Sequence, residues 1–594
     1  MSKEIIAWDL SDLYSDISDP KIKDDMKEIE KLAEAFIKTV KGNLTNPDLN
    51  PKQLGEWYKL LENIHEKKFY IYLFSSLNYS TTSLEDDVKN LFSQIQEFNS
   101  KINEQILFFH LELNRITDEK YDELLTSSVL ENYKHDLEFN RKQKPHQLSE
   151  KEEQIILMKN ISGKNGFIKL YNEIESGFIY EFEYEGEIKQ YTGSELFAFM
   201  YNKDPEVRYK ALKTFVSEFE NNELVFTHIY NNVMKDWGLE NKRRKYTKPI
   251  SLRNVENEVS DKAVETLGKV TSESNYIVEK YYNLKKKILD LSKLRMSDLY
   301  APFGDVEKKY TYEEGVELVN TANGNFNPEF AEIVEEMYKR EHIDVTPRKG
   351  KQGGAFCSYG KQKMYPFVFV NYTDDIESVL TLAHELGHAI HHYYIQQNQT
   401  FTNIDSSLAV AEIASVFNEM IAFDYLMKQD LSKEDRISLL ANHIEGNFST
   451  SHRQNAFYNF ETRIHELMKE KLPTATEYKE IFVEEMQKMF GNSITDIKED
   501  YASYWSVVGH FIHVPFYVYA YNMSNLLVIA LYQMYLEEGE EFVPKLTKLL
   551  SVGISKTPAE MLGEVGIDLD DPNFWNKGIN YLSAKVSELE ELLS

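Results

Sequence analysis

Two histidines and a glutamate within one short stretch have the types and the spacing needed to bind and use a metal ion. The stretch reads His384-Glu385-Leu386-Gly387-His388. Residues four apart lie on one face of a helix, so both imidazoles can reach a single ion. Zinc accepts imidazole nitrogens, and a catalytic zinc site keeps one position for water. Glu385 is close enough to take a proton from that water, whose pKa the ion lowers, and this arrangement is typical of zinc metallopeptidases.

A third ligand is expected from the segment that follows the motif. Glu412, Ser415 and Glu419 are spaced so that they share one face of a second helix. Carboxylates in an apolar helix are costly to bury unless they are paired or bound to a metal ion. Glu412 follows His388 by 412 − 388 = 24 residues, which is enough for a helix end, a turn and a return. We therefore predict Glu412 as the third ligand, with Ser415 and Glu419 behind the ligands. Glu419 is expected to orient a histidine, and an ordinary surface carboxylate is the alternative.

The elements that position the motif are two short strands and one long helix. Residues 355–359 and 365–371 are rich in aromatic and β-branched side chains and predict two strands. Residues 373–375 (Thr-Asp-Asp) predict the cap of a helix that begins near Ile376. Gly387 falls inside this helix, where glycine costs ~1 kcal/mol relative to alanine, so we expect another element to pack closely against it.

Helical periodicity dominates the rest of the chain. Residues 21–41, for example, carry apolar side chains at intervals of three and four, as amphipathic helices do. The exception is residues 178–191, where apolar and polar residues alternate around one turn and predict a β-hairpin. We therefore predict a mainly α fold with a helical N-terminal domain over residues 1–200 and a catalytic zinc metallopeptidase domain over residues 201–594.

Composition limits the classes of protein that fit. The 594 residues are 42% hydrophobic and 13% aromatic, which is ample for a large core, and their formal net charge is −30. That charge repels phosphate backbones and argues against nucleic acid as a partner. The longest apolar run near a helix, residues 526–532, is far shorter than the ~20 residues that span a bilayer, and residues 1–8 lack the features of a secretory leader. We expect a cytoplasmic protein with no membrane partner and no obligate protein partner.

Five stretches together resemble peptidase family M3. They are residues 353–358, 384–391, 412–419, 515–521 and 566–575. Within M3 the chain is most similar to the oligoendopeptidase F branch, which is related to thimet oligopeptidase and neurolysin. The resemblance implies a two-lobed, prolate helical fold around a deep central channel, with a small β-sheet beside the helix of the histidine motif. It also implies one zinc ion per chain and cleavage of internal bonds in short, unstructured oligopeptides.

The same resemblance implies roles for a segment near the C-terminus. His510 and Tyr521 match the histidine and the tyrosine that polarise the substrate in the family, and an imidazole or a hydroxyl is a suitable donor to an oxyanion. His513 and Tyr517 are candidates for binding substrate, and a loop histidine without function is the alternative for His513. Pro515 is expected to begin the helix here, which would place Tyr517 and Tyr521 on one face.

Gly354, Ala355 and Phe356 are predicted to bind substrate as part of an edge strand. Such a strand forms hydrogen bonds with the backbone of an extended peptide, and glycine permits close approach. The resemblance favours this role, whereas composition alone indicates an ordinary strand.

Two alternatives to an endopeptidase stay open. One is an exopeptidase of carboxypeptidase type from the same clan, which would leave peptides with blocked ends intact. The other is a helical scaffold whose zinc ion is purely structural and is closed by four ligands.

Two neighbouring features receive simpler interpretations. His391 and His392 follow the motif and are predicted to be solvent-exposed, with a place behind the metal ligands as the alternative. The basic residues 242–245 are predicted to pair with nearby acids on a helix face rather than to bind nucleic acid.

Overall fold

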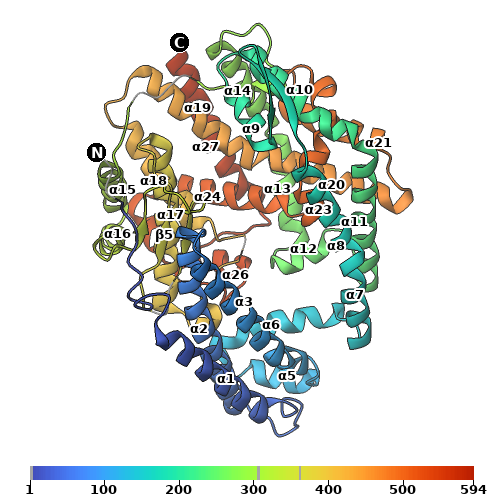
Figure 1. The fold of residues 1–594 in the computed structure, drawn as a ribbon, viewed down its shortest axis with the longest axis vertical. Helices are drawn as coiled ribbons and strands as arrows, with labels where there is room; N and C mark the ends of the chain where they lie inside the picture. The colour runs from blue at the N-terminus through green and yellow to red at the C-terminus, as the bar shows by residue number, and fades with distance from the viewer. Residues whose placement is uncertain (1–4, 304–307, 360–362, 408) are drawn as a thin grey trace. The chain divides into compact units, whose positions relative to one another are not determined.

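The computed structural model describes residues 5–303, 308–359, 363–407 and 409–594, and it is mainly α-helical, as predicted (Figure 1). Backbone contacts divide the chain into two compact units, each assembled from three stretches of sequence. The first unit comprises residues 1–144, 308–429 and 535–566, and the second comprises residues 145–307, 430–534 and 567–594. Both units draw on sequence before and after residue 200. The division into a domain of residues 1–200 and a domain of residues 201–594 stays a prediction. The two-lobed shape with a central channel also stays a prediction.

The first unit contains the N-terminal helices, a three-stranded sheet and the helices around the histidine motif. Its helices are α1 (Pro20–Val40), α2 (Pro51–Thr81), α3 (Asp86–Ile106), α4 (Phe108–Leu113), α5 (Asp118–Leu125), α6 (Lys134–Gln143), α15 (Tyr312–Phe326), α16 (Pro328–Lys339), α17 (Ile376–Asn398), α18 (Ile413–Met427), α25 (Val543–Leu550) and α26 (Pro558–Gly563). Its strands are β3 (Ile343–Asp344), β4 (Phe356–Ser358) and β5 (Phe367–Phe369).

The second unit is helical apart from one hairpin. Its helices are α7 (Glu150–Ser162), α8 (Lys164–Ser176), α9 (Gly193–Ala198), α10 (Pro205–Asn221), α11 (Glu223–Arg243), α12 (Ser251–Glu256), α13 (Asp261–Glu273), α14 (Asn275–Ile288), α19 (Lys433–Thr450), α20 (His452–Glu470), α21 (Ala475–Phe490), α22 (Ile497–Asp500), α23 (His510–His513), α24 (Val518–Glu538) and α27 (Pro572–Leu593). Its strands are β1 (Tyr180–Tyr184) and β2 (Glu187–Tyr191).

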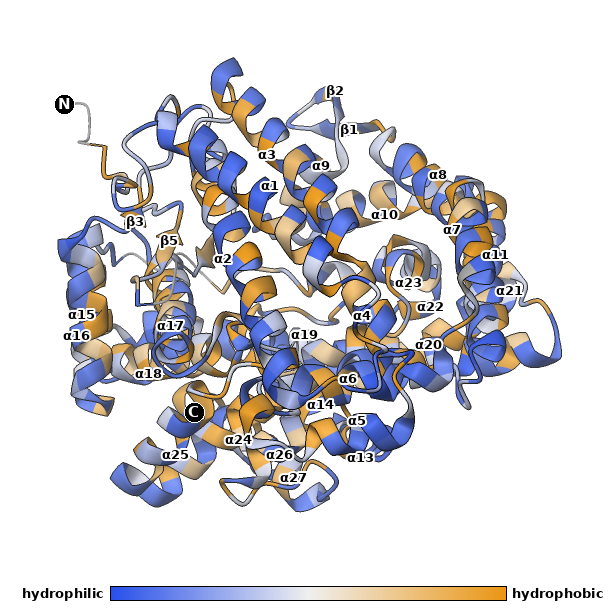
Figure 2. Cartoon of the chain, turned by 90° about the horizontal axis from the view of Figure 1, so that it is seen from below, coloured by the Kyte–Doolittle hydropathy of each residue, from blue (hydrophilic) through white to orange (hydrophobic). Residues whose placement is uncertain are grey.

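Local signals in the sequence explain where the helices begin. The Asp19 side chain caps α1, whose first residue is Pro20, and the Asp375 side chain accepts from the Ser378 N–H to cap α17. Polar and apolar residues alternate in bands along α1 and α2, as expected for amphipathic helices (Figure 2). Within the described ranges, no helix combines the length and the apolar character needed to cross a bilayer.

Both predicted pairs of strands form. β1 and β2 make an antiparallel hairpin in which Tyr180 pairs with Tyr191, and Glu185 and Gly186 have positive φ in its turn. In the other sheet β5 is central, because it runs parallel to β3 and antiparallel to β4. β4 is therefore an edge strand of this sheet, and it packs with β5 against α17.

An apolar core in the first unit joins the N-terminal helices to the sheet beside α17. Phe36 and Phe74, from α1 and α2, are buried in this core, and β5 adds Phe367 and Phe369 to it. The ring of Trp8 lies 6.3 Å from Phe367 and 5.8 Å from Phe369 between centroids. Burial of each such ring contributes about 1.5–3 kcal/mol, so the sheet that flanks the motif is held by N-terminal residues.

The helix that follows Pro515 begins later than predicted. α23 and α24 are separated by a turn in which Phe516 has a φ of 59°, in the left-handed region. The Phe516 N–H donates to Glu461 Oε1 (2.9 Å), and Glu461 is a buried residue of α20. The prediction that Pro515 begins the helix is therefore wrong, and Tyr517 lies in the turn before α24.

Candidate metal centre

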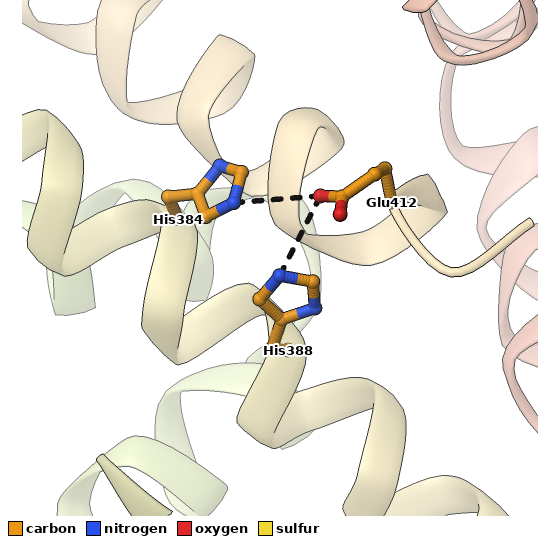
Figure 3. Close-up of side chains that lie close together, drawn as sticks. All are labelled: His384, His388 and Glu412. Carbon is orange, nitrogen blue, oxygen red and sulfur yellow. Dashed lines mark ion pairs between the residues drawn. The ribbon is translucent and has the colours of Figure 1, made fainter. Parts of the chain in front are cut away.

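α17 presents both histidines of the motif on one face. The ring centroids of His384 and His388 are 5.0 Å apart, and the side chains retain 28% and 20% exposure. Figure 3 shows both imidazoles turned toward the carboxylate of Glu412, which comes from the segment leading into α18. The two histidines of the motif and Glu412 therefore lie together, as predicted from the sequence.

These three side chains have the geometry of a metal site. Glu412 Oε2 lies 3.4 Å from His384 Nε2 and 3.5 Å from His388 Nε2, and one ligand atom from each residue lies within 4.8 Å of the others. Ligands of a tetrahedral zinc ion, each ~2.0–2.1 Å from the metal, are ~3.3–3.4 Å from one another. The donor set and its spacing therefore fit zinc, and three protein ligands leave one tetrahedral position.

Gly387 allows α18 to approach the motif. A Cβ at this position would lie 2.5 Å from the carbonyl oxygen of Ala414 and 2.6 Å from Ser415 Cα, so no side chain fits without a shift of the backbone. The Asn418 side chain on α18 also donates from Nδ2 to the carbonyl of Ala383 on α17 (2.6 Å). The predicted close approach is confirmed, and it fixes the start of α18 against α17.

Glu412 is held at the start of α18 by its neighbour. Glu412 is the residue immediately before the first helical residue of α18. The sequence predicted that Glu412, Ser415 and Glu419 all lie within this helix, so the helix begins one residue later than predicted. Ser415 Oγ lies 2.6 Å from Glu412 Oε2 and donates to it. Ser415 is fully buried, and it therefore orients the carboxylate from the protein interior.

Glu419 lies behind His384, where the sequence interpretation places it. His384 Nδ1 is 3.3 Å from Glu419 Oε2, so an N–H at Nδ1 donates to this carboxylate and leaves the Nε2 lone pair facing Glu412. Burial lowers the pKa of His384, but the hydrogen bond and the charge of Glu419 outweigh it and the net pKa is raised. For His388, burial lowers the pKa to about 4, so its imidazole is neutral near pH 7.

Glu385 is buried beside the three candidate ligands. Its side chain is only 6% exposed, and its Oε2 has no hydrogen-bond partner among the described residues. Burial raises the pKa of Glu385 to about 7, with the charges of His384 and Glu412 acting in opposite directions. A carboxyl group of this pKa can both accept and release a proton near neutral pH.

His391 and His392 are not solvent-exposed, so that prediction is wrong. His391 is 4% exposed and forms a hydrogen bond with the backbone of Ala411, the residue before Glu412. Burial lowers the pKa of His391 to about 4 and that of His392 well below its usual value. His391 follows His388 by three residues, and this helical spacing was the available signal that it faces α18.

The predicted substrate strand lies next to the motif. Phe356 is in β4 and stacks on Phe369 at 4.7 Å, whereas Gly354 and Ala355 precede the strand. Gly354 has a φ of 83° and open space around it, and its carbonyl accepts from Asn371 Nδ2 (2.9 Å). Burial raises the pKa of Cys357 in β4, and the charge of Glu385 adds to this effect, which places the strand within electrostatic range of the motif.

The histidine and tyrosine candidates of the C-terminal segment form a cluster in the second unit. His510 Nε2 lies 3.2 Å from the Tyr521 hydroxyl. The rings of His510 and Tyr517 are parallel at 5.7 Å, and Tyr517 and Tyr521 are perpendicular at 5.1 Å. His513 instead has its Nε2 2.6 Å from Asn172 Oδ1. Three of the four candidates therefore contact one another, and their role toward substrate stays a prediction.

A mainly helical fold with two histidines from one helix and a carboxylate from the next defines a class of protein, the metallopeptidases. Residues 198–581 match the family model described as Peptidase family M3, and residues 112–178 match the model described as Oligopeptidase F. The first match covers more than half of the chain, which therefore belongs to peptidase family M3. The predicted enzyme class, a metallo-endopeptidase, and the resemblance to the oligoendopeptidase F branch are confirmed.

Named relatives agree over almost the whole chain. Oligopeptidase PepF of Bacillus subtilis is 27% identical over 600 residues, a match that covers 99% of this chain and 87% of the relative. An oligoendopeptidase F homolog of Borreliella burgdorferi is 27% identical over 597 residues, with 98% of each chain covered. The crystal structure of oligoendopeptidase-F from Enterococcus faecium superposes with a TM-score of 0.70 at 21% identity, covering 96% of this chain and 99% of that one. This structural match supports the fold.

Proposed function

We propose that the chain is a zinc-dependent endopeptidase that hydrolyses internal bonds of short, unstructured oligopeptides. The observation that carries the proposal is the buried Glu385 carboxyl group, with an unpartnered oxygen, beside His384, His388 and Glu412. The relatives named as oligoendopeptidase F support the substrate class.

One zinc ion per chain is the proposed cofactor, held by His384, His388 and Glu412. Their spacing fits tetrahedral coordination, and Glu419 and Ser415 orient the first histidine and the carboxylate. When bound, zinc supplies Lewis acidity toward water and toward the scissile carbonyl.

Glu385 is the proposed general base. Its raised pKa of about 7 reflects burial, and its Oε2, which has no hydrogen-bond partner in the described part of the chain, is available to accept the proton of the attacking water. The protonated carboxyl group then gives this proton to the nitrogen of the leaving amine, which restores the carboxylate. The same side chain thus acts first as a base and then as an acid.

His510 and Tyr521 are the proposed donors to the oxyanion that forms when the carbonyl is attacked. The imidazole Nε2 and the hydroxyl lie 3.2 Å apart, so a hydrogen bond between them can orient one group while the other donates to the oxyanion. Tyr517 and His513 are proposed to contact substrate alongside them. Parallel packing against Tyr517 holds the His510 ring in one orientation.

The edge strand β4 is proposed to hold the substrate backbone. Gly354, Ala355 and Phe356 lead into a strand that is at the edge of its sheet among the described strands, so an extended peptide can pair with it. Backbone pairing does not depend on side-chain identity, which suits an enzyme for varied peptides. The cytoplasmic location and the lack of nucleic-acid, membrane and obligate protein partners stay predictions from the sequence.

The proposal is tested by digestion of a mixed peptide library, with products identified by mass spectrometry. We expect internal cleavage of peptides that are acetylated and amidated at their ends, and loss of cleavage with a chelator. Glu385→Gln should abolish turnover while zinc content, measured by atomic spectrometry, stays near one per chain. Glu377→Gln, an exposed glutamate in the first turn of α17, is the matched control and should behave as wild type.

Three results would contradict the proposal. Turnover that persists in Glu385→Gln would remove the general base. Cleavage confined to free chain ends would favour an exopeptidase. Stoichiometric zinc without hydrolysis of any peptide would favour a structural zinc in a scaffold.

A further inference from the structure

A cavity of about 330 Å³ in the second unit is lined by cationic and neutral donor groups. Its volume is at the small end of the range for ligand pockets. The groups of interest on its wall are Arg453, Tyr300, Tyr501, Tyr504, His510 and His513. Among the described residues that line it none is acidic, although acidic residues outnumber basic ones 97 to 67 in the whole chain.

Arg453 is the fixed positive charge on this wall. Its guanidinium donates to the Tyr300 hydroxyl (3.0 Å) and to Ser449 Oγ, and both acceptors are neutral. Across the described part of the chain, no carboxylate lies within ion-pair distance of Arg453. A guanidinium presents five N–H donors in a plane, so donors remain for a carboxylate.

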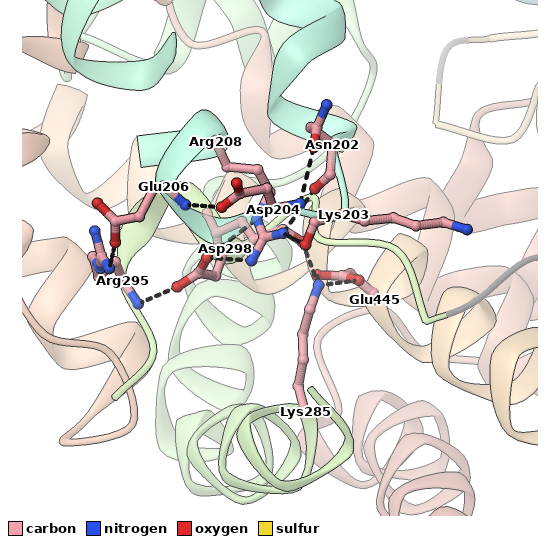
Figure 4. A network of polar contacts seen from close by, with 10 residues as sticks. Asn202, Lys203, Asp204, Glu206, Arg208, Lys285, Arg295, Asp298 and Glu445 are labelled. Atoms are coloured by element: carbon pink, nitrogen blue, oxygen red, sulfur yellow. Dashed lines mark hydrogen bonds and ion pairs between the residues drawn. The ribbon is translucent and has the colours of Figure 1, made fainter. Parts of the chain in front are cut away.

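Glu445 and Asp298, two acids of the second unit, are each paired with another cation (Figure 4). Lys285 Nζ lies 2.7 and 2.9 Å from the two oxygens of Glu445. The charge of Arg453 acts on Glu445 at longer range and helps to lower its pKa, although burial raises that pKa overall. Asp298 is bound by Arg208 at 2.7 Å, and both side chains are almost fully buried. Since Glu445 has Lys285 as its direct ion-pair partner, Arg453 forms no ion pair with a described carboxylate and can offer its charge to the cavity.

We propose that Arg453 binds the C-terminal carboxylate of the peptide substrate in this cavity. The inference rests on the proposed function, because His510 and His513 connect the cavity to the segment proposed to contact substrate. A carboxylate matches the planar donors of arginine and can accept a further hydrogen bond from a phenol on the wall, that of Tyr501 or Tyr504. An acidic side chain near the end of a peptide offers the same chemistry, so the test separates the two sources.

The test compares one N-acetylated peptide with neutral side chains in two forms, with a free C-terminal carboxylate and with a C-terminal amide. We expect wild-type kcat/KM to be about 10- to 100-fold higher for the acid, mainly through KM, and the amide still to be cleaved. Arg453→Gln should lose this preference, so that within this variant the acid and the amide have the same kcat/KM. Arg453→Lys, which keeps the charge but not the planar donors, should retain part of the preference.

A matched control is Arg463→Gln, on the same helix α20. Arg463 is paired with Glu485 (2.6 Å) and Glu484 (2.7 Å), so its loss should leave both peptides unaffected. Thermal unfolding of each variant shows whether it is folded. If Arg453→Gln does not fold, Arg453→Lys still tests the proposal.

A second readout separates this inference from the proposed function. Binding of the same two peptides, labelled with a fluorophore, is measured by anisotropy on the Glu385→Gln enzyme. Equal affinity for acid and amide, or an equal loss of both in Arg453→Gln, would overturn the inference even if cleavage is normal. If an amidated peptide that ends in glutamate binds as tightly as the free acid, Arg453 recognises an acidic side chain, and the proposal that it binds the terminal carboxylate is overturned. No cleavage of either peptide, with tighter binding of the acid, would contradict the proposed function alone.

Discussion

Gly387→Ala tests whether the contact between α17 and α18 sets the metal site. The added Cβ would lie 2.5 Å from the Ala414 carbonyl oxygen and 2.6 Å from Ser415 Cα. Ordinary carbon contacts are ~3.5–4.0 Å, so the two backbones must separate by about 1 Å. Glu412 precedes Ala414 by only two residues, and metal ligands tolerate displacements of about 0.2 Å. The substitution should therefore move Glu412 out of ligand range.

Two opposing effects determine the stability of this variant. Overpacking against backbone costs about 2–3 kcal/mol, and alanine in place of glycine within a helix recovers about 1 kcal/mol. We expect the metal-free protein to lose about 1–2 kcal/mol in free energy of unfolding. We also expect zinc affinity to fall by about 10- to 100-fold, as it does when support of a ligand is removed.

The assay pairs urea unfolding of the metal-free protein with zinc competition against a chromophoric chelator. Gly238→Ala is the matched control, because Gly238 lies inside α11 and an added Cβ there meets no atom within 4 Å. That control should gain up to about 1 kcal/mol from helix propensity and should not change zinc affinity. Wild-type zinc affinity in Gly387→Ala, together with an unfolding free energy at or above wild type, would refute the reasoning.

Three further predictions concern side chains around the two sites. Glu419→Gln should lower zinc affinity by about 10-fold or more in the same competition assay, because His384 loses its charged partner; unchanged affinity would mean that Glu419 is an ordinary surface residue. Tyr521→Phe should lower kcat by about 10²–10³-fold with little change in KM. The control is Tyr519→Phe, which removes a buried hydroxyl that accepts a hydrogen bond from Asn257; a similar loss of kcat in this control would indicate a structural cause. Burial raises the pKa of the Glu461 carboxyl group from 4.5 to about 8, so the folded state binds this proton more tightly than the unfolded state. The free energy of unfolding should therefore fall as the pH rises from 4.5 to 8, by at most about 1.4 kcal/mol per pH unit. Urea unfolding across this range should show a shallower slope for Glu461→Gln, and an unchanged slope would rule out Glu461 as the cause.

The cluster of candidate ligands could be predicted because its determinants are local. The positions of His384 and His388 follow from helical spacing, and Glu412 follows from chain length and the cost of a carboxylate among apolar residues. Gly387 signalled a close neighbour because glycine is unfavourable inside a helix. The residues concerned lie within a few turns of chain, and they are in contact in the structure.

Features that depend on distant partners could not be predicted. The left-handed Phe516 is held by Glu461, 55 residues earlier in the chain, and no local pattern shows that bond. His391 follows the motif in a polar run, yet its burial depends on where the backbone of Ala411 returns. Among the described residues Arg453 has no ion-pair partner, and Glu445 pairs instead with Lys285, which lies 160 residues earlier in the chain, so no local pattern shows this pairing.

The free edge of β4 has a consequence for selection of substrates. On the proposed function, a peptide docked there satisfies its main-chain amides and carbonyls whatever residues it carries. A peptide that is already helical or paired with itself must first break its own hydrogen bonds, and a disordered one need not. Such an enzyme sorts its targets by the conformational freedom of their backbone, so rigidifying a peptide by cyclisation or by proline should protect it at sites of otherwise identical composition.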